Sequence, residues 1–445
     1  MSYPAVSNAS PTGVRSTLAR HILADGLDLV FDHEGSHGAW LRDARSGREY
    51  LDFMTFFASL PIGYNHPALA DAAFLERLHR VARIKPTLSD VYTAEFAEFV
   101  AGLEERGFIP SHLPHAFFIE GGALAVENAL KTAFDWKARR NRSRGVAGGP
   151  GGQVIHFRQA FHGRSGYTLS LTNTDPVKTD LFPKFDWPRI DNPKLTFPLT
   201  PETERAAAAA EQAALDQIRR VFEERGDAVA AIIIEPIQAE GGDNHFRGEF
   251  LRALQAVARE REVFFILDEV QTGVGLTGRM WAHQHWDLSP DAISFGKKAQ
   301  VCGCLVGRKV DEVPDNVFRV SSRLNSTFGG NLTDMVRFGR YLEIITAERM
   351  VENAAEVGGL LLRELEGLQQ ELGGLITGAR GRGLMIAFDM DTAERRRRAV
   401  EKIREGGLLL LGCGERSIRF RPPLNLDAGE AAKGIDVIRR SLKAL

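Results

Sequence analysis

Short apolar runs recur between long helical patterns in the middle of this chain, and this alternation constrains the fold more than any other feature. The runs are rich in β-branched and aromatic residues and are too short for helices. Strands that are apolar throughout are buried on both faces, which is typical of a mostly parallel sheet covered by helices on both sides. The sequence therefore predicts an α/β fold. The expected strands are Ala116–Glu120, Val154–Phe157, Ala230–Glu235, Val263–Asp268, Ala292–Phe295 and Leu305–Val306.

The two ends of the chain follow a different pattern. Before about residue 75 the sequence is irregular, and after about residue 335 it is dominated by helices, with short strands near Gly383–Phe388 and Ser417–Phe420. A chain of 445 residues has room for two or three substructures. We expect segment 1–74 and segment 336–445 to form a smaller α+β domain beside a large domain, 75–335.

Charge and composition exclude several classes of protein. The formal net charge of −2 gives no general attraction to nucleic acids or acidic membranes. The segment Met1–Thr17 is polar, and no stretch reaches the roughly 20 apolar residues of a membrane span, so a cytoplasmic location is expected. Cys302 and Cys304 alternate in an expected strand and point to opposite faces, which favours buried thiols over a metal site; we expect no metal.

Polar residues cluster where the expected strands end. In open α/β sheets, ligands bind outside the carboxyl ends of the strands. This edge is therefore the predicted ligand site. The groups that follow strands are Phe161-His162-Gly163-Arg164, Glu235-Pro236, Asp268-Glu269 and Gly296-Lys297.

Two of these residues suggest a specific chemistry. Asp268 ends a run of five apolar residues, so its carboxylate needs a cationic partner such as a protonated pyridine nitrogen, although an aspartate that caps a helix fits equally well. Lys297 follows Gly296, and burial would lower its pKa and make it a nucleophile for a Schiff base. On its own Lys297 could be a surface residue in a doublet with Lys298. Its pairing with Asp268, at the end of the preceding strand, favours the catalytic interpretation.

Two glycine patterns suggest phosphate binding. Gly121-Gly122-Ala123 leads into the expected helix Leu124–Lys137, and free N–H groups at such a helix start can bind an anion. The segment Gly273–Gly278 matches the dinucleotide fingerprint G-x-G-x-x-G. It does not follow its strand immediately, however, and the next strand ends in a lysine rather than an acid, so an NAD-dependent dehydrogenase is disfavoured.

Together these residues resemble the class III pyridoxal-phosphate aminotransferases along nearly the whole chain. The resemblance rests on Leu267–Gly273, the glycine-rich turn after it, Asp291 and Gly296-Lys297 at the family's spacing. It implies the fold-type I architecture, with pyridoxal 5'-phosphate as the cofactor. Within the family the chain looks most like the members that act on the ε-amino group of L-lysine. The stretches that carry this narrower likeness are Glu120–Asn128, Ala160–Tyr167, Pro183–Arg189 and Asn325–Asn331.

The resemblance also implies roles around the cofactor. Lys297 would form the internal aldimine and later move the proton, Asp268 would bind the pyridine nitrogen, and Gln271 would lie near the phenolic oxygen. Phe161 would stack on the ring. The phosphate would be bound by the backbone of Gly122 and Ala123, and by Thr327 from the other subunit of a homodimer. Most relatives have Ser where this chain has Ala123. The hydroxyl that would bind the phosphate is missing here, so the backbone N–H groups must contribute more of the phosphate binding.

Charge geometry suggests how substrates would be bound. Lysine presents its ε-amine to the cofactor, so its distant α-carboxylate needs a cation, and Arg164 is the candidate. For the second substrate, 2-oxoglutarate, the resemblance implies Arg419 as a further cation and Glu240 as a switch that covers it while an amine is bound. If these residues do not bind substrate, Arg419 is expected to form a surface ion pair and Glu240 to be a solvated loop residue. Asn325 is the remaining expected substrate residue, and Ala239 stands where close relatives tend to have Gly.

The expected reaction converts L-lysine and 2-oxoglutarate to L-2-aminoadipate 6-semialdehyde and L-glutamate. Ornithine and 4-aminobutyrate are the alternative amines. A pyridoxal-phosphate decarboxylase or aminomutase is a more distant alternative, as is a regulator that binds the cofactor without turnover.

Overall fold

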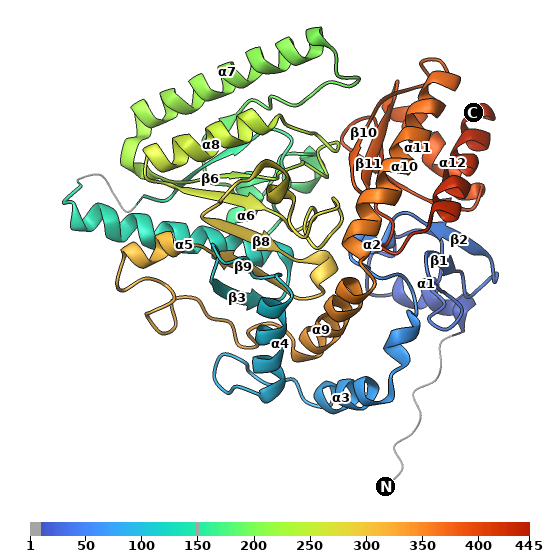
Figure 1. Ribbon diagram of the computed structural model, residues 1–445, viewed down its shortest axis with the longest axis horizontal. Coiled ribbons are helices and arrows are strands. Elements are labelled where there is room, and N and C mark those ends of the chain that lie inside the picture. The colour runs from blue at the N-terminus through green and yellow to red at the C-terminus, as the bar shows by residue number, and fades with distance from the viewer. Residues whose placement is uncertain (1–9, 147–150) are drawn as a thin grey trace.

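The computed structural model describes residues 10–146 and 151–445, and a seven-stranded sheet forms its centre (Figure 1). The strand order is β3-β9-β8-β7-β6-β4-β5, and β9 alone runs opposite to its neighbours. The mostly parallel sheet expected from the apolar runs is therefore confirmed. The strands are β3 His115–Ile119, β4 Gln153–Phe157, β5 Arg189–Ile190, β6 Val229–Ile234, β7 Phe264–Asp268, β8 Ala292–Phe295 and β9 Cys302–Val306.

Helices cover both faces of this sheet because its strands are apolar on both sides. Alternate residues of β7 point to opposite faces. Phe264 and Ile266 pack with α5, which spans Gly122–Ser143, whereas Phe265 and Leu267 share a core with α8, which spans Gly248–Glu260. Helix α5 thus begins two residues before the expected helix and ends six residues after it. The other helices of this part are α4 Ala94–Glu105, α6 Gly166–Leu171, α7 Pro201–Arg225 and α9 Leu332–Ala347.

A second group of elements combines both ends of the chain. In Figure 1 the blue strands β1 and β2 lie beside the orange and red helices of the C-terminal part. The parallel pairing of β2 with β12 joins the two ends, since Leu51 pairs with Leu408 and Asp52 with Leu409. This part contains β1 Trp40–Arg42, β2 Glu49–Asp52, β10 Ile376–Arg382, β11 Met385–Met390, β12 Leu408–Leu409, β13 Leu411–Cys413, β14 Ser417–Phe420, α10 Met350–Glu371, α11 Ala393–Glu405 and α12 Ala428–Lys443.

Three further helices lie near the N-terminus: α1 Val14–Leu18, α2 Thr55–Ala58 and α3 Ala72–Ala82. Helix α2 contributes to the cavity described below. Helix α3 begins just before the expected boundary at residue 75, and α9 runs across the one at residue 335. The domain limits stay a prediction.

No helix in residues 10–146 or 151–445 combines the length and the apolar character that crossing a bilayer requires. The polar N-terminal segment expected from the sequence, Met1–Thr17, lies partly outside the described residues, which begin at Ser10.

Candidate active site

A cavity of about 520 Å³ opens at the carboxyl edge of the central sheet. It brings together most of the site residues that the sequence predicts, from segments far apart in the chain. Asn325 and Thr327 do not line it; both are exposed. The predicted residues that line it are Gly122, Ala123, Phe161, Arg164, Glu240, Asp268, Gln271, Lys297 and Arg419.

Lys297 follows β8, and its amine is free to react. Within the described part of the chain its Nζ has no hydrogen bond or ion pair, and burial lowers its pKa, an effect that nearby Arg419 reinforces. The preceding Gly296 allows the backbone to approach β9, because a Cβ there would lie 2.7 Å from the sulfur of Cys302. The neighbouring Lys298 is buried and donates to the carbonyl of Ala58 at 2.9 Å. One lysine of the doublet is thus structural and the other faces the cavity.

Asp268 ends β7 and is buried, as its apolar run predicts. One carboxylate oxygen accepts hydrogen bonds from Ser294 Oγ at 2.9 Å and from the Val270 N–H at 3.1 Å. The other lies 2.7 Å from Nδ1 of His162. Three donors therefore stabilise a charged carboxylate that still borders the cavity, which suits an interaction with a protonated ring nitrogen.

Glu235 is a second buried carboxylic acid beside this pair. Its two oxygens accept from the backbone N–H groups of Phe161 and Ala239, both at 3.0 Å. Burial raises its pKa to about 7; His162 opposes this shift and Asp268 adds to it. Near neutral pH Glu235 is therefore close to its titration point.

The N-terminus of α5 supplies an anion site in the same cavity. Gly121 precedes the helix with φ of 101°, and no side chain caps the first turn. The loop after β4 comes so close that a Cβ on Gly163 would lie 2.4 Å from the Cβ of Ala123, and Gly163 itself has φ of 125°. Free N–H groups at the start of a long helix attract a phosphate.

A strained turn contributes an aromatic residue that the sequence analysis missed. The four residues of α2, Thr55–Ala58, all have positive φ, and Phe57, the third of them, lines the cavity. Asp52 stabilises the start of the turn by accepting from the N–H groups of Met54 and Thr55, at 2.7 and 2.9 Å. Such strain in non-glycine residues is concentrated at functional sites. Unlike an apolar run, it leaves no periodic signal in the sequence.

Two arginines of the cavity differ in their partners. Arg164 is exposed and has no hydrogen bond or ion pair with the described residues. Arg419, on β14, is buried; it donates to Glu240 at 2.7 Å and more weakly to Gln271 at 3.4 Å. Arg421 donates to the same oxygen of Gln271 at 2.8 Å and fixes that side chain. One guanidinium is thus available, and the other is covered by a carboxylate.

Lys178 is a further cavity residue that the sequence analysis did not identify. It lies after α6 in the loop that leads toward β5, and its Nζ is 2.5 Å from Oε1 of Glu240. It also lies 5.5 Å from the centre of the Phe161 ring. Lys178 does not follow an expected strand, so the search for polar residues at strand ends did not find it.

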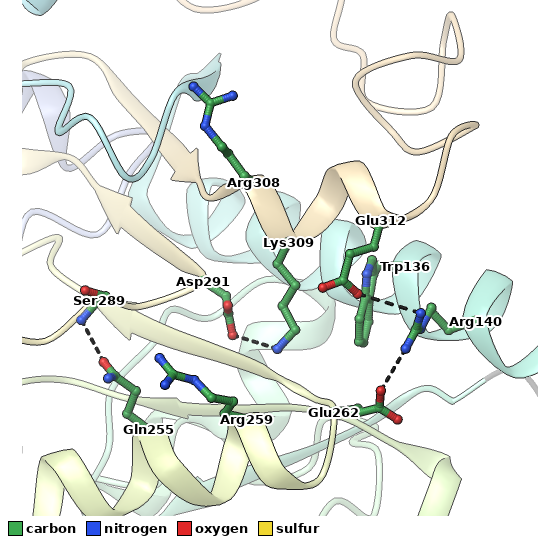
Figure 2. Close-up of a pocket in the computed structure, with 10 residues that line it drawn as sticks. All are labelled: Trp136, Arg140, Gln255, Arg259, Glu262, Ser289, Asp291, Arg308, Lys309 and Glu312. Atoms are coloured by element: carbon green, nitrogen blue, oxygen red, sulfur yellow. Dashed lines mark hydrogen bonds and ion pairs between the residues drawn. The ribbon is translucent and has the colours of Figure 1, made fainter.

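A second cavity, of about 600 Å³, lies at the opposite edge of the sheet, where β7 and β8 begin (Figure 2). It is larger, but none of the predicted site residues lines it. Its charges are largely paired: Arg140 contacts Glu262 at 2.7 Å, and Lys309 contacts Asp291 at 2.9 Å. The carboxyl edge therefore remains the candidate active site.

Comparison with known proteins agrees with this geometry. The sequence pattern described as "Aminotransferase class-III" matches residues 24–442, almost the whole chain. The chain is a class III aminotransferase. The match confirms the family resemblance and, with it, the fold-type I architecture.

Relatives of this class III aminotransferase match nine-tenths or more of its length. The L-lysine-epsilon aminotransferase of Mycobacterium tuberculosis is 50% identical over 97% of this chain and 96% of its own. The solved structure of a lysine aminotransferase from M. tuberculosis superposes with a TM-score of 0.95 at 50% identity, covering 98% of this chain and 99% of the other. The mitochondrial 4-aminobutyrate aminotransferase of Mus musculus is more distant, at 33% identity over 90% of this chain and 82% of its own.

The cofactor of this aminotransferase is pyridoxal 5'-phosphate, and the cavity fits it. The uncapped start of α5 suits the phosphate, and the buried carboxylate of Asp268 suits the ring nitrogen. Lys297 offers an amine that has no partner among the described residues and whose pKa is lowered by burial. Each part of the cofactor thus has a group of matching charge.

Proposed function

We propose that this protein transfers the ε-amino group of L-lysine to 2-oxoglutarate, yielding L-2-aminoadipate 6-semialdehyde and L-glutamate. The observation that carries the proposal is the pair of arginines around Lys297: Arg164 has no partner in residues 10–146 and 151–445, whereas Arg419 is covered by Glu240. Relatives named for lysine, at 45–50% identity, support lysine over the 4-aminobutyrate relatives, which are 33–34% identical. Ornithine remains the alternative amine of closest length.

In this reaction the cofactor supplies the electron sink for the substrate carbanion. Asp268 keeps the ring nitrogen protonated through its charge. Lys297 would hold the cofactor and, when the substrate amine takes its place, would accept a proton from the substrate carbon and return it later. Burial lowers the pKa of Lys297 and so favours its neutral, basic form. Phe161 would stack on the ring, and Gln271 would lie at its phenolic oxygen.

Charge would decide how each substrate lies. The α-carboxylate of lysine would bind Arg164, which leaves the ε-amine to point toward Lys297. With Glu240 paired, Arg419 presents little net charge to an incoming ω-amine. When 2-oxoglutarate binds, Arg419 would take its α-carboxylate and Arg164 the other one.

The proposal includes a homodimer with shared sites. Thr327 would reach the phosphate of the partner subunit and Asn325 its substrate, which fits their exposure away from this subunit's own cavity. Large apolar side chains are exposed nearby, including Val91, Tyr92 and Phe328, at 65%, 76% and 37%. Exposed apolar patches are typical of interfaces. The cytoplasmic location stays a prediction.

A competition between amines tests the substrate. Purified holoenzyme would be assayed with L-lysine, L-ornithine and 4-aminobutyrate at equal concentrations, with 2-oxoglutarate as acceptor and glutamate formation as the readout. We expect the highest kcat/KM for lysine. A higher kcat/KM for ornithine or 4-aminobutyrate would identify that amine as the substrate in place of lysine. Absence of glutamate would favour a decarboxylase, an aminomutase or a regulator that only binds the cofactor.

The cofactor bond has a separate test. The purified protein should show the absorbance of cofactor bound covalently through Lys297, and Lys297→Ala should lose that band. Lys402→Ala, which changes an exposed lysine on α11, is the matched control and should keep it.

A further inference from the structure

Glu240 is held by two cations, and each of its carboxylate oxygens has its own partner. Oε2 lies 2.7 Å from Nη2 of Arg419, and Oε1 lies 2.5 Å from Nζ of Lys178. Burial alone would raise the pKa of Glu240, but Arg419 and Lys178 hold it below its usual value. Glu240 is therefore charged near neutral pH.

The backbone around Glu240 is fixed on both sides. The N–H of Ala239 donates to Glu235 at 3.0 Å, and the carbonyl of Glu240 accepts from the N–H of Gly414 at 2.8 Å. Ala239 is fully buried. Any movement that uncovers Arg419 is consequently a rotation of the Glu240 side chain, with a reach of a few ångströms.

Such a rotation would be costly without a second partner. The side chain of Glu240 is 26% exposed, so water solvates it only in part. A largely buried carboxylate that loses its cation is strongly destabilised. Lys178 already contacts the far oxygen and is 25% exposed, so it can follow a rotating carboxylate. Its position beside the Phe161 ring keeps its ammonium near the cavity.

We propose that Lys178 is a positioning residue that keeps Glu240 paired when the α-carboxylate of the keto acid takes over Arg419. In the amine half-reaction Glu240 has both partners; in the keto-acid half-reaction it retains Lys178 alone. Lys178 thereby favours the uncovered form of Arg419 and supports the binding of the keto acid more than the binding of the amine. This inference rests on the proposed exchange between an ω-amine and 2-oxoglutarate.

The two half-reactions of the holoenzyme separate these effects. Each would be followed in a single turnover by the change in cofactor absorbance, with lysine added to the aldehyde form and 2-oxoglutarate to the amine form. For Lys178→Met we expect the apparent Kd of 2-oxoglutarate to rise by about tenfold, as for one lost charge contact. The apparent Kd of lysine should change less than about twofold. Calorimetric titration of the amine form with glutarate, which binds without reacting, should give the same rise.

Three further variants test the cause. Lys178→Arg keeps the charge and should restore tight binding of the keto acid. In Glu240→Gln there is no carboxylate to hold, so adding Lys178→Met should change the Kd of glutarate less than about twofold. Lys402→Met is the control for loss of an exposed lysine and should match wild type.

The outcomes that overturn the inference differ from those that overturn the function. Equal weakening of lysine and 2-oxoglutarate by Lys178→Met would make Lys178 a general structural residue. An undiminished effect of Lys178→Met in the Glu240→Gln background would mean that Lys178 binds the substrate directly. An unchanged Kd for glutarate would remove the role altogether. If the wild type itself fails to react with lysine, the proposed function fails instead.

Discussion

Nδ1 of His162 lies 2.7 Å from Oδ2 of Asp268, and both side chains are buried. Because an ionised carboxylate only accepts hydrogen bonds, the proton of this contact lies on the histidine nitrogen. The other oxygen of Asp268 is shared by Ser294 and the Val270 N–H. The carboxylate that a protonated cofactor ring would require is thus held by contacts from the loop after β4, from β8 and from the turn after β7.

Loss of the histidine contact should weaken catalysis without abolishing it. We expect His162→Leu to lower kcat by roughly tenfold or more, since a hydrogen bond to a charged group contributes about 1.5–3 kcal/mol. His162→Asn places an amide donor near the position of Nδ1 and should lose less than about threefold. Steady-state kcat with saturating cofactor measures both. Equal losses in the two variants would contradict a role for this hydrogen bond.

Glu235 should make stability depend on pH. Its pKa is raised from an ordinary 4.5 to about 7, so the folded protein binds an extra proton between these values. The stability that protonated Glu235 provides is fully present below pH 4.5 and is lost as the pH rises through 7, by about 3 kcal/mol at most. Urea unfolding of wild type and Glu235→Gln at pH 5 and pH 8 should show this loss in the wild type only. If the free energy of unfolding changed with pH by the same amount in wild type and Glu235→Gln, the titrating group would not be Glu235.

Arg164 should recognise the carboxylate of lysine and nothing else in that substrate. Cadaverine is lysine without its carboxylate, so wild type should prefer lysine, and Arg164→Gln should remove most of the preference. We expect kcat/KM for lysine to fall by roughly 10- to 100-fold, and for cadaverine by less than about twofold. The exposed Arg416, replaced by Gln, is the control. A parallel fall for both amines would mean that Arg164 supports the site in another way.

Mixed dimers should reveal whether Thr327 acts across the interface of the proposed homodimer. A dimer of one Lys297→Ala chain and one Thr327→Ala chain would have one site with both residues intact and one site with neither. At limiting cofactor, an equal mixture of the re-associated variants should recover about a quarter of the wild-type activity. Activity equal to the mean of the two parent variants would place Thr327 at the site of its own subunit.

The central sheet and much of the site could be predicted from the sequence because both depend on local patterns. The apolar run before Asp268 had to be a buried strand, and the end of such a strand is where ligands bind in an α/β sheet. The lowered pKa of Lys297 followed from the burial expected at that position and is confirmed. The predicted role of Arg164 followed from the charge of the substrate, and the roles of Glu240 and Arg419 from the family resemblance; all three stay predictions.

The remaining features depend on contacts between distant segments. The composition of β9 does not show whether the strand runs parallel or antiparallel to its neighbours, because a short buried strand is apolar in either orientation. Lys178 reaches Glu240 only because the loop after α6 folds over the cavity. The turn containing Phe57 is kept in its strained form partly by Lys298, which follows β8 and lies 240 residues after Ala58 in the sequence. Periodicity carries no information about such contacts.

The pairing of β2 with β12 also sets an order of events during synthesis. At about 5–20 residues per second, a ribosome needs on the order of 20 to 70 s between completing β2 and completing β12. Through that interval Tyr50 and Leu51, which end up buried, lack the strand that will cover them. The N-terminal segment of the nascent chain must therefore wait for its partner strand with apolar side chains exposed, which is the kind of surface that chaperones bind.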